Sequence, residues 1–192
     1  MKNVFVGLLA ITIATAANAQ GRTTFGLKAG VNIATLSLDN DPNLDPRVGL
    51  YAGGLAHIHV SPNFAIQPEV VYSAQGFSDI NGSDVKWKLD YVNIPVMAQY
   101  MFNNGFRIET GPQLGLLASA KAKTGSTESD LKDDIKGTDV SWGFGLSYLS
   151  ASQVGIGARY NLGLSNINES GSNDVKNRVF QVGLFYQFAP KH

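Results

Sequence analysis

The chain has 192 residues, with 15 Lys and Arg against 15 Asp and Glu and no cysteine. This length suits a single domain. Without cysteine the chain has no disulfide framework and no thiolate metal site. A formal net charge of zero without a basic patch argues against nucleic-acid binding. After residue 20 no apolar run is long enough to form a membrane-spanning helix.

The N-terminal segment has the features of a cleaved signal peptide. Lys2 supplies a positive charge, Val4–Ala14 form an apolar run, and Ala17 and Ala19 give a small-x-small cleavage pattern. Because the run is too short to cross a bilayer as a helix, a permanent membrane anchor is disfavoured. We predict cleavage after Ala19, with a signal peptide at 1–19 and the mature domain at 20–192.

The mature chain is predicted to contain eight β-strands. In each of them apolar and polar residues alternate, as expected when successive side chains point to opposite faces of a sheet. The predicted strands are Phe25–Leu36, Val48–Val60, Phe64–Gln75, Trp87–Phe102, Phe106–Ala118, Asp139–Leu149, Gln153–Leu162 and Arg178–Phe188.

The connections between these strands alternate in length. The short ones are Ser61–Asn63, Asn103–Gly105 and Ser150–Ser152. The long, polar ones are Ser37–Pro46, Gly76–Lys86, Ser119–Thr138 and Gly163–Asn177. Tight turns at one end and long loops at the other indicate an all-β, eight-stranded, antiparallel up-and-down transmembrane barrel in the outer membrane. An even number of strands places both termini on the periplasmic side and the long loops outside the cell.

The two faces of the predicted strands differ in charge. One face is almost wholly apolar. The other carries a set of five charged residues, Lys28, Glu69, Arg107, Glu109 and Arg159. An Arg or Lys in the middle of the lipid-facing surface costs roughly 2–4 kcal/mol, so we assign these residues to the lumen. An eight-stranded interior is just wide enough for side chains to fill, and buried charges need partners. We therefore expect a salt-bridge network that plugs the lumen, with a charged pore lining as the alternative.

Aromatic residues lie on the apolar face near both ends of the strands. Such rows are typical of the aromatic girdles at the two membrane interfaces. The predicted interface aromatics are Tyr72, Tyr100, Trp142, Tyr148, Tyr160, Tyr186 and Phe188. The chain ends four residues after Phe188, and a terminal strand that closes on an aromatic is what the outer-membrane assembly machinery usually recognises. Outer-membrane lipid and that machinery are thus the expected partners.

Two features resemble metal sites without completing one. His57 and His59 lie two residues apart on one strand face, but no third ligand is identifiable. Asp39–Asp45 alternates oxygen-bearing side chains as a calcium loop does, but it lacks the required Gly, and Leu50 stands where the Glu is needed. We expect neither a metal nor a cofactor.

The remaining polar features point to structure rather than catalysis. The chain has no Gly-x-Ser-x-Gly nucleophile motif, so we expect no enzymatic activity. The mixed charges of residues 128–136 predict a hydrated surface loop. Because proline cannot donate a hydrogen bond within a sheet, Pro68, Pro95 and Pro112 are predicted to mark β-bulges.

Six short phrases along the mature chain carry a resemblance to a known family. They are Phe25-Gly-Leu-Lys-Ala-Gly-Val-Asn, Gln67-Pro-Glu-Val-Val-Tyr-Ser-Ala-Gln-Gly, Leu89-Asp-Tyr-Val-Asn-Ile-Pro-Val, Glu109-Thr-Gly-Pro-Gln, Ala158-Arg-Tyr-Asn-Leu-Gly-Leu and Phe180-Gln-Val-Gly-Leu-Phe-Tyr-Gln-Phe. Together they resemble the PorT-like outer-membrane β-barrel proteins of Bacteroidetes-type bacteria, also called the porin family. The resemblance implies an eight-stranded barrel similar to OmpX and to the membrane domain of OmpA, without a settled activity.

These observations leave three functions open. The leading one is a structural or surface-interaction role for a monomeric barrel, with a surface or periplasmic protein as a possible partner. The second is passive passage of small solutes through the lumen. The third is a soluble ligand-binding barrel in the periplasm, which would need the opposite orientation of the two strand faces.

Overall fold

The computed structural model describes residues 23–38, 44–80, 85–124, 127–132, 134–169 and 174–188. The predicted signal peptide with Ala17 and Ala19 and most of the calcium-like stretch (residues 39–43) lie outside these residues. Within the described part of the chain, no helix has the length and apolar character needed to cross a membrane.

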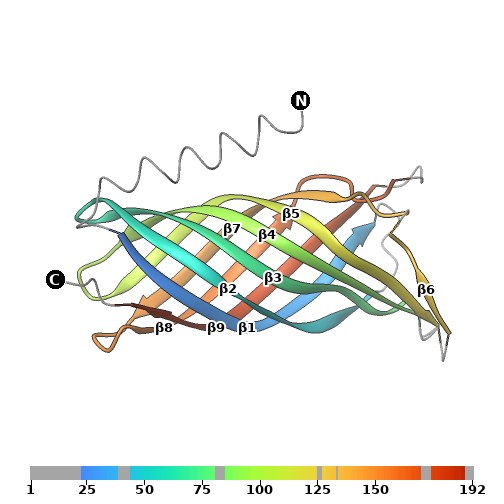
Figure 1. Ribbon diagram of the computed structural model, residues 1–192, viewed down its shortest axis with the longest axis horizontal. Coiled ribbons are helices and arrows are strands. Elements are labelled where there is room, and N and C mark those ends of the chain that lie inside the picture. Colours follow the sequence, from blue (N-terminus) through green and yellow to red (C-terminus); the bar gives the residue numbers. More distant parts are fainter. Residues whose placement is uncertain are drawn as a thin grey trace.

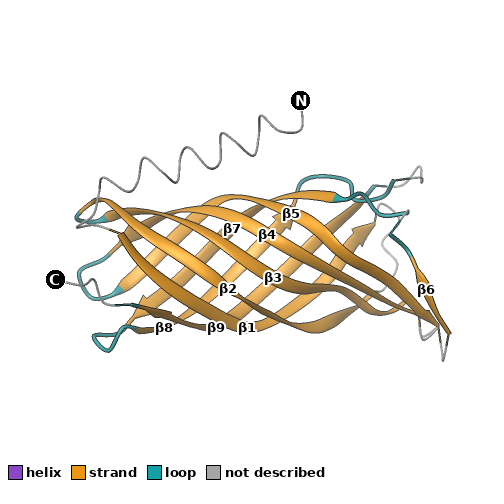
Figure 2. Cartoon of the chain, in the orientation of Figure 1, coloured by secondary structure: helices purple, strands orange, loops and turns teal. Residues whose placement is uncertain are grey.

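Nearly all of the described chain is β-strand. The strands are β1 (Thr23–Leu38), β2 (Leu44–Ser61), β3 (Phe64–Ile80), β4 (Val85–Met101), β5 (Phe106–Thr124), β6 (Thr127–Asp130), β7 (Thr138–Leu149), β8 (Val154–Gly163) and β9 (Val175–Gln187). Figures 1 and 2 show that the strands are tilted and form an elongated cylinder.

Eight of these strands close into a barrel. Each pairs antiparallel with its neighbours in the order β1-β2-β3-β4-β5-β7-β8-β9, and β1 pairs with both β2 and β9, which joins the two edges. Closure leaves no free sheet edge in the cylinder, as a lipid environment requires. The predicted eight-stranded, antiparallel, up-and-down barrel is therefore confirmed.

The ends of the barrel differ as predicted. At one end, tight turns join β2 to β3, β4 to β5 and β7 to β8, and their closing hydrogen bonds include Phe102 N–H to Phe106 O at 2.8 Å and Ser150 N–H to Val154 O at 3.0 Å. Phe188 N–H donates to Phe25 O at 2.8 Å, so the chain enters and leaves at this same end. It lies at the left of Figure 1. The longer connections lie at the opposite end, which we call the long-loop end.

The strands run further into the predicted loops than expected. The predicted loop Ser119–Thr138 is wrong in its first half, because β5 continues to Thr124 and turns back as β6. β6 pairs with β5 and extends the sheet beyond the cylinder (Figure 1). The hydrophobic pattern is faint here, since small alanines alternate with lysines from Ala120 to Lys123.

The three prolines do not mark bulges, which corrects the prediction. Pro68 pairs with Val96, and three residues further Val71 pairs with Asn93, so no residue is inserted between these pairs. The same constant register holds from Pro95 to Ala98 on β4 against β5 and around Pro112 on β5 against β7. The register shift of the β4–β5 pair lies instead between Asp90 and Tyr91. A proline removes one hydrogen-bond donor but does not lengthen the strand, which explains why register survives it.

Alternation along the strands separates an apolar exterior from a polar interior. Val70 is 57% exposed, whereas its neighbour Glu69 is 2% exposed, and Ile156 at 54% contrasts with Arg159 at 5%. More than two dozen large apolar side chains lie exposed on the outer surface of the described residues. An exposed apolar area of this extent needs a nonaqueous environment, and hydrocarbon supplies it.

Candidate functional site

Among the described residues, ionisable side chains gather away from solvent in the lumen. The tilt of the strands brings inward-facing residues of β1, β3, β5 and β8 to one level near the middle of the cylinder. These residues are Lys28, Glu69, Glu109 and Arg159, four of the five predicted lumen charges.

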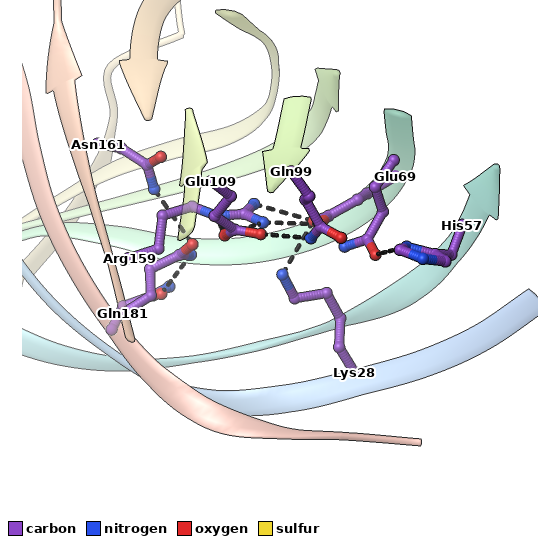
Figure 3. Close-up of polar contacts among 10 residues, drawn as sticks. Lys28, His57, Glu69, Gln99, Glu109, Arg159, Asn161 and Gln181 are labelled. Carbon is purple, nitrogen blue, oxygen red and sulfur yellow. Dashed lines mark hydrogen bonds and ion pairs between the residues drawn. The ribbon is translucent and has the colours of Figure 1, made fainter. Parts of the chain in front are cut away.

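Arg159 is the centre of this ionic network (Figure 3). Its Nη1 and Nη2 donate to the two carboxylate oxygens of Glu69 at 3.0 and 2.7 Å. Its Nε donates to Glu109 Oε1 at 2.7 Å. A guanidinium group can bind two carboxylates in this way because its donors form a planar fork.

Neutral and cationic neighbours complete the coordination of the two carboxylates. Lys28 Nζ donates to Glu69 Oε2 at 2.9 Å, and Gln67 Nε2 donates to Glu69 Oε1 at 2.9 Å. Gln99 Nε2 donates to Glu109 Oε2 at 2.6 Å. Two cations and two anions thus balance within the network, and the side chain of Glu69 has no exposed area.

The fifth predicted charge, Arg107, lies apart from this network, toward the short-turn end. Its Nη2 donates to Gln187 Oε1 at 3.2 Å, and its guanidinium carbon lies 6.0 Å from the centroid of the Phe185 ring. Within the described residues it forms no ion pair. The ring of Phe185 lies over Gly155, where a Cβ atom would overlap it. Arg107 is thus held by an amide and an aromatic ring rather than by a carboxylate.

A layer of amides and hydroxyls lies on the other side of the ionic network. Asn32 Nδ2 donates to Ser73 Oγ at 2.9 Å, and Gln181 Nε2 donates to Asn32 Oδ1 at 2.8 Å. Asn161 Nδ2 donates to Gln181 Oε1 at 3.1 Å, which links β8 to β9 and, through Asn32, to β1. These contacts join polar side chains across the lumen, although Asn161 Oδ1 accepts no hydrogen bond from the described residues.

The long-loop end of the lumen is closed by apolar side chains, which we call the apolar cap. Its buried members come from the strand ends and from two loops, and they are Leu36, Phe77, Leu89, Tyr91, Ala120, Ile135, Ile167 and Val175. Ile135 and Ile167 belong to the β6–β7 and β8–β9 connections and are 4% and 0% exposed. The two connections are joined by Lys136 N–H to Ile167 O at 2.8 Å and by Glu169 N–H to Asp134 O at 3.0 Å.

The apolar cap was not predicted from the alternation of apolar and polar residues. Residues 128–136 were predicted to form a hydrated surface loop. This prediction is wrong for Ile135, which is buried in the cap. The available signal was the presence of large aliphatic residues in two otherwise polar loops, with Leu131 and Ile135 in one and Leu164 and Ile167 in the other.

The cavity beside the ionic network is small. A cavity of about 30 Å³ lies beside the ionic network, with Lys28, Tyr51, Gln99, Glu109 and Arg159 among its lining residues. Such a volume holds one or two water molecules. Ligand pockets are commonly ten times larger or more.

The two strand histidines lie in the lumen near the short-turn end. His57 is buried, its Nδ1 lies 3.2 Å from Gln67 Oε1, and its ring meets that of His59 edge-on with centroids 4.6 Å apart. No cluster of three or more His, Cys, Asp or Glu side chains suited to a metal occurs among the described residues.

The seven predicted interface aromatics all lie on the outer surface. Their exposed fractions run from 38% for Trp142 and Tyr160 to 48% for Tyr72. Trp142 Nε1 donates to Thr110 Oγ1 at 2.8 Å, which satisfies its one polar group on the apolar surface. At the short-turn end, edge-on ring pairs join Tyr100 to Phe102 and Tyr186 to Phe188.

The chain matches a protein-family model and is similar in fold to solved structures of other proteins. The family model described as "Outer membrane protein beta-barrel domain" matches residues 16–169. Neisserial surface protein A is similar in structure, with a TM-score of 0.55, 16% identity and coverage of 85% of this chain and 97% of that one. Ail, the attachment invasion locus protein of Yersinia pestis, has a TM-score of 0.55 at 15% identity, with coverage of 87% and 98%.

The sequence identity to both structures is low, so these similarities show that the fold is shared and nothing about function. A search among curated proteins finds no match. The family match covers most of the chain and agrees with the closed barrel, its apolar exterior and its ionic interior. The chain therefore belongs to the family of outer membrane proteins with a β-barrel domain, and its place is the outer membrane.

Proposed function

We propose that the protein is a non-conducting barrel that anchors its long loops at the cell surface for structural or interaction roles. The observation that carries the proposal is the lumen itself, which is filled by the Arg159 network and closed by the apolar cap. The proposal places the short turns and both termini in the periplasm. It assigns no catalytic activity to the chain and treats the barrel as a monomer.

The proposal also includes a subgroup within the family, export by a signal peptide, and aromatic girdles at the membrane surfaces. The phrases quoted above, such as Glu109-Thr-Gly-Pro-Gln113, support membership of the PorT-like, or porin, group within the family. The predicted signal peptide, with cleavage after Ala19, supports export. Likewise, the interface aromatics support girdles at the two membrane surfaces.

A small passive pore is the competing function, because the lumen does contain a cavity beside Lys28 and Arg159. To conduct, an ion would have to cross both the ionic network and the cap. A soluble ligand carrier is disfavoured, since the apolar face points outward and the cavity of about 30 Å³ is too small for a ligand.

Planar-bilayer recording with purified protein separates the first two functions. We expect no stable single-channel steps from the wild-type barrel. The variant Ile135→Asp/Ile167→Asp, which disrupts only the cap, should stay silent because the ionic network remains. Reproducible unitary steps from the wild-type protein, scaling with the amount inserted, would establish the pore and exclude the proposal.

A further inference from the structure

A buried carboxylate, that of Asp139 on β7, lies in the lumen next to the apolar cap. Asp139 is 5% exposed, and it pairs with Gly115 of β5. The groups that donate hydrogen bonds to the carboxylate are all neutral. They are Ser165 Oγ and Asn177 Nδ2, at 2.9 Å each, and the backbone N–H of Val140. Among the described residues Asp139 forms no ion pair, and no cation lies near enough to act on it.

Three buried polar atoms near this carboxylate have no hydrogen-bond partner within the described part of the chain. They are Tyr91 Oη, Asn93 Nδ2 and Asn177 Oδ1, in residues that are 1%, 2% and 3% exposed. The Tyr91 hydroxyl lies close enough to Asp139 to interact with it electrostatically, and the Asn177 amide lies within reach of both. Buried polar groups without partners destabilise a fold, so folding alone does not favour this arrangement.

The absence of a side chain at Gly115 allows these groups to approach one another. Gly115 pairs with Asn93 of β4 on one side and with Asp139 of β7 on the other. A Cβ atom at Gly115 would lie 2.9 Å from Asn93 Oδ1 and 3.4 Å from Asp139 Cβ. It would also lie 3.3 Å from Tyr91 Cδ1. The glycine therefore leaves room for oxygen-bearing side chains of β4 and β7 to meet across β5.

The charge and the atom types of this cluster fit a monovalent cation. Its oxygen atoms come from the Asp139 carboxylate, from the amides of Asn93 and Asn177, and from the hydroxyls of Tyr91 and Ser165. Hard cations prefer oxygen ligands, and protein oxygens can replace the hydration shell of a monovalent ion. A buried charge needs a partner of opposite sign. One carboxylate balances one positive charge, whereas a divalent cation would leave a net charge buried in the cylinder.

We propose that Asp139 and its oxygen-bearing neighbours bind one monovalent alkali cation, such as Na⁺, at the long-loop end of the lumen. Asn177 presents Nδ2 to the carboxylate, and half a turn of its terminal amide presents Oδ1 instead. The cation then joins β4, β7 and β9 to the β8–β9 connection, which contributes Ser165. No metal was expected from the sequence, because these residues come from separate elements and share no spacing. The inference is independent of the proposed surface role.

Binding of Na⁺ to the purified protein in detergent micelles tests this inference. Sodium NMR reports the bound ion as excess broadening of the resonance, which we expect from the wild type. Asp139→Asn should abolish the broadening, because it removes the one negative charge of the site. Tyr91→Phe, which removes only the unpartnered hydroxyl, should weaken the affinity several-fold. The matched control Asp130→Asn removes an exposed carboxylate from β6 and should broaden the resonance as the wild type does.

Thermal unfolding gives a second, independent measurement. Replacing N-methylglucamine chloride by NaCl at constant ionic strength should raise the unfolding midpoint of the wild type, because a ligand of the folded state stabilises it. The midpoint of Asp139→Asn should be the same in both salts. In the absence of Na⁺ it should lie at or above that of the wild type, because a neutral amide needs no counter-charge.

Three results would overturn the proposal. The first is the absence of excess broadening from the wild type, a measurement that needs no variant to fold. The second is equal broadening by the wild type and Asp139→Asn, which would place the bound ion elsewhere. The third is full displacement of Na⁺ by micromolar Ca²⁺, which would indicate a divalent site. None of these results bears on whether the lumen conducts, so failure of the cation site is distinguishable from failure of the proposed function.

Discussion

Arg159 illustrates how single residues hold the lumen together. One guanidinium on β8 contacts two buried carboxylates that come from β3 and β5. Burying two such charges is costly, and the pair is stabilising only while its partners are complete. The residue that joins both carboxylates should therefore be the one whose loss costs most.

We predict that Arg159→Met lowers the free energy of unfolding by about 3–5 kcal/mol, because Glu69 and Glu109 are left buried without their shared cation. Urea unfolding from lipid vesicles, followed by tryptophan fluorescence, measures this. Arg178→Met removes an exposed arginine from β9 and is the matched control, with a change within about 0.5 kcal/mol. A loss below 1 kcal/mol at Arg159 would mean that the network is not a stabilising plug.

The alternation of apolar and polar residues predicted which side chains face the lumen, but it did not predict which of them contact one another. Alternation along each strand assigned Lys28, Glu69 and Arg159 to the same face, because it can be read from a few neighbouring residues in the sequence. Which charged side chains contact each other depends on the tilt of the strands and on the stagger between neighbouring strands. Alternation within one strand gives no information about either. For this reason the sequence grouped Arg107 with the others, whereas the structure places it beside Gln187 and Phe185.

At the scale of elements, two connections at the long-loop end pack against each other despite their polar sequence. The β6–β7 and β8–β9 connections are joined to each other through an isolated bridge between Ile135 and Asn168. Each also contributes a buried isoleucine to the apolar cap. Contacts between two loops far apart in sequence leave no periodic signal, which is why the cap could not be predicted from alternation.

We predict that Ile167→Ala loosens both connections, because it removes a fully buried side chain shared between them. Limited proteolysis of the reconstituted protein should then cleave near Lys132 and Lys136 several-fold faster than in the wild type. Ile156→Ala, on the lipid-facing surface of β8, should leave the cleavage rate unchanged. Equal rates for Ile167→Ala and the wild type would show that the cap does not hold the loops.

Strand boundaries were the least predictable part of the elements. Strand pairing beyond the apolar surface needs no hydrophobic face, so the extension of β5 and the whole of β6 were invisible to a search for alternation. The proline prediction failed for a different reason. It equated a missing donor with an inserted residue, and the unbroken register at Pro68 and Pro95 shows that these are separate events.

At the scale of the whole molecule, the absence of cysteine makes the orientation in the cell directly testable. We predict that Lys132→Cys, in the β6–β7 connection, reacts with a membrane-impermeant maleimide on intact cells. Asn104→Cys, in the short turn between β4 and β5, should react only after the cells are lysed. The reverse pattern would place the long loops in the periplasm and contradict the proposed surface role.

The central claim is that apolar side chains face lipid while ionic ones are sealed inside the cylinder, and a spin-label scan of β7 tests it most directly. Single cysteines at Phe144 and Leu146, each 53% exposed, and at the inward-facing Ser141 and Ser147 would carry the label in reconstituted vesicles. The account predicts strong relaxation by oxygen at the first two positions and little at the last two. Uniform oxygen contact along β7, or contact greatest at Ser141 and Ser147, would contradict it.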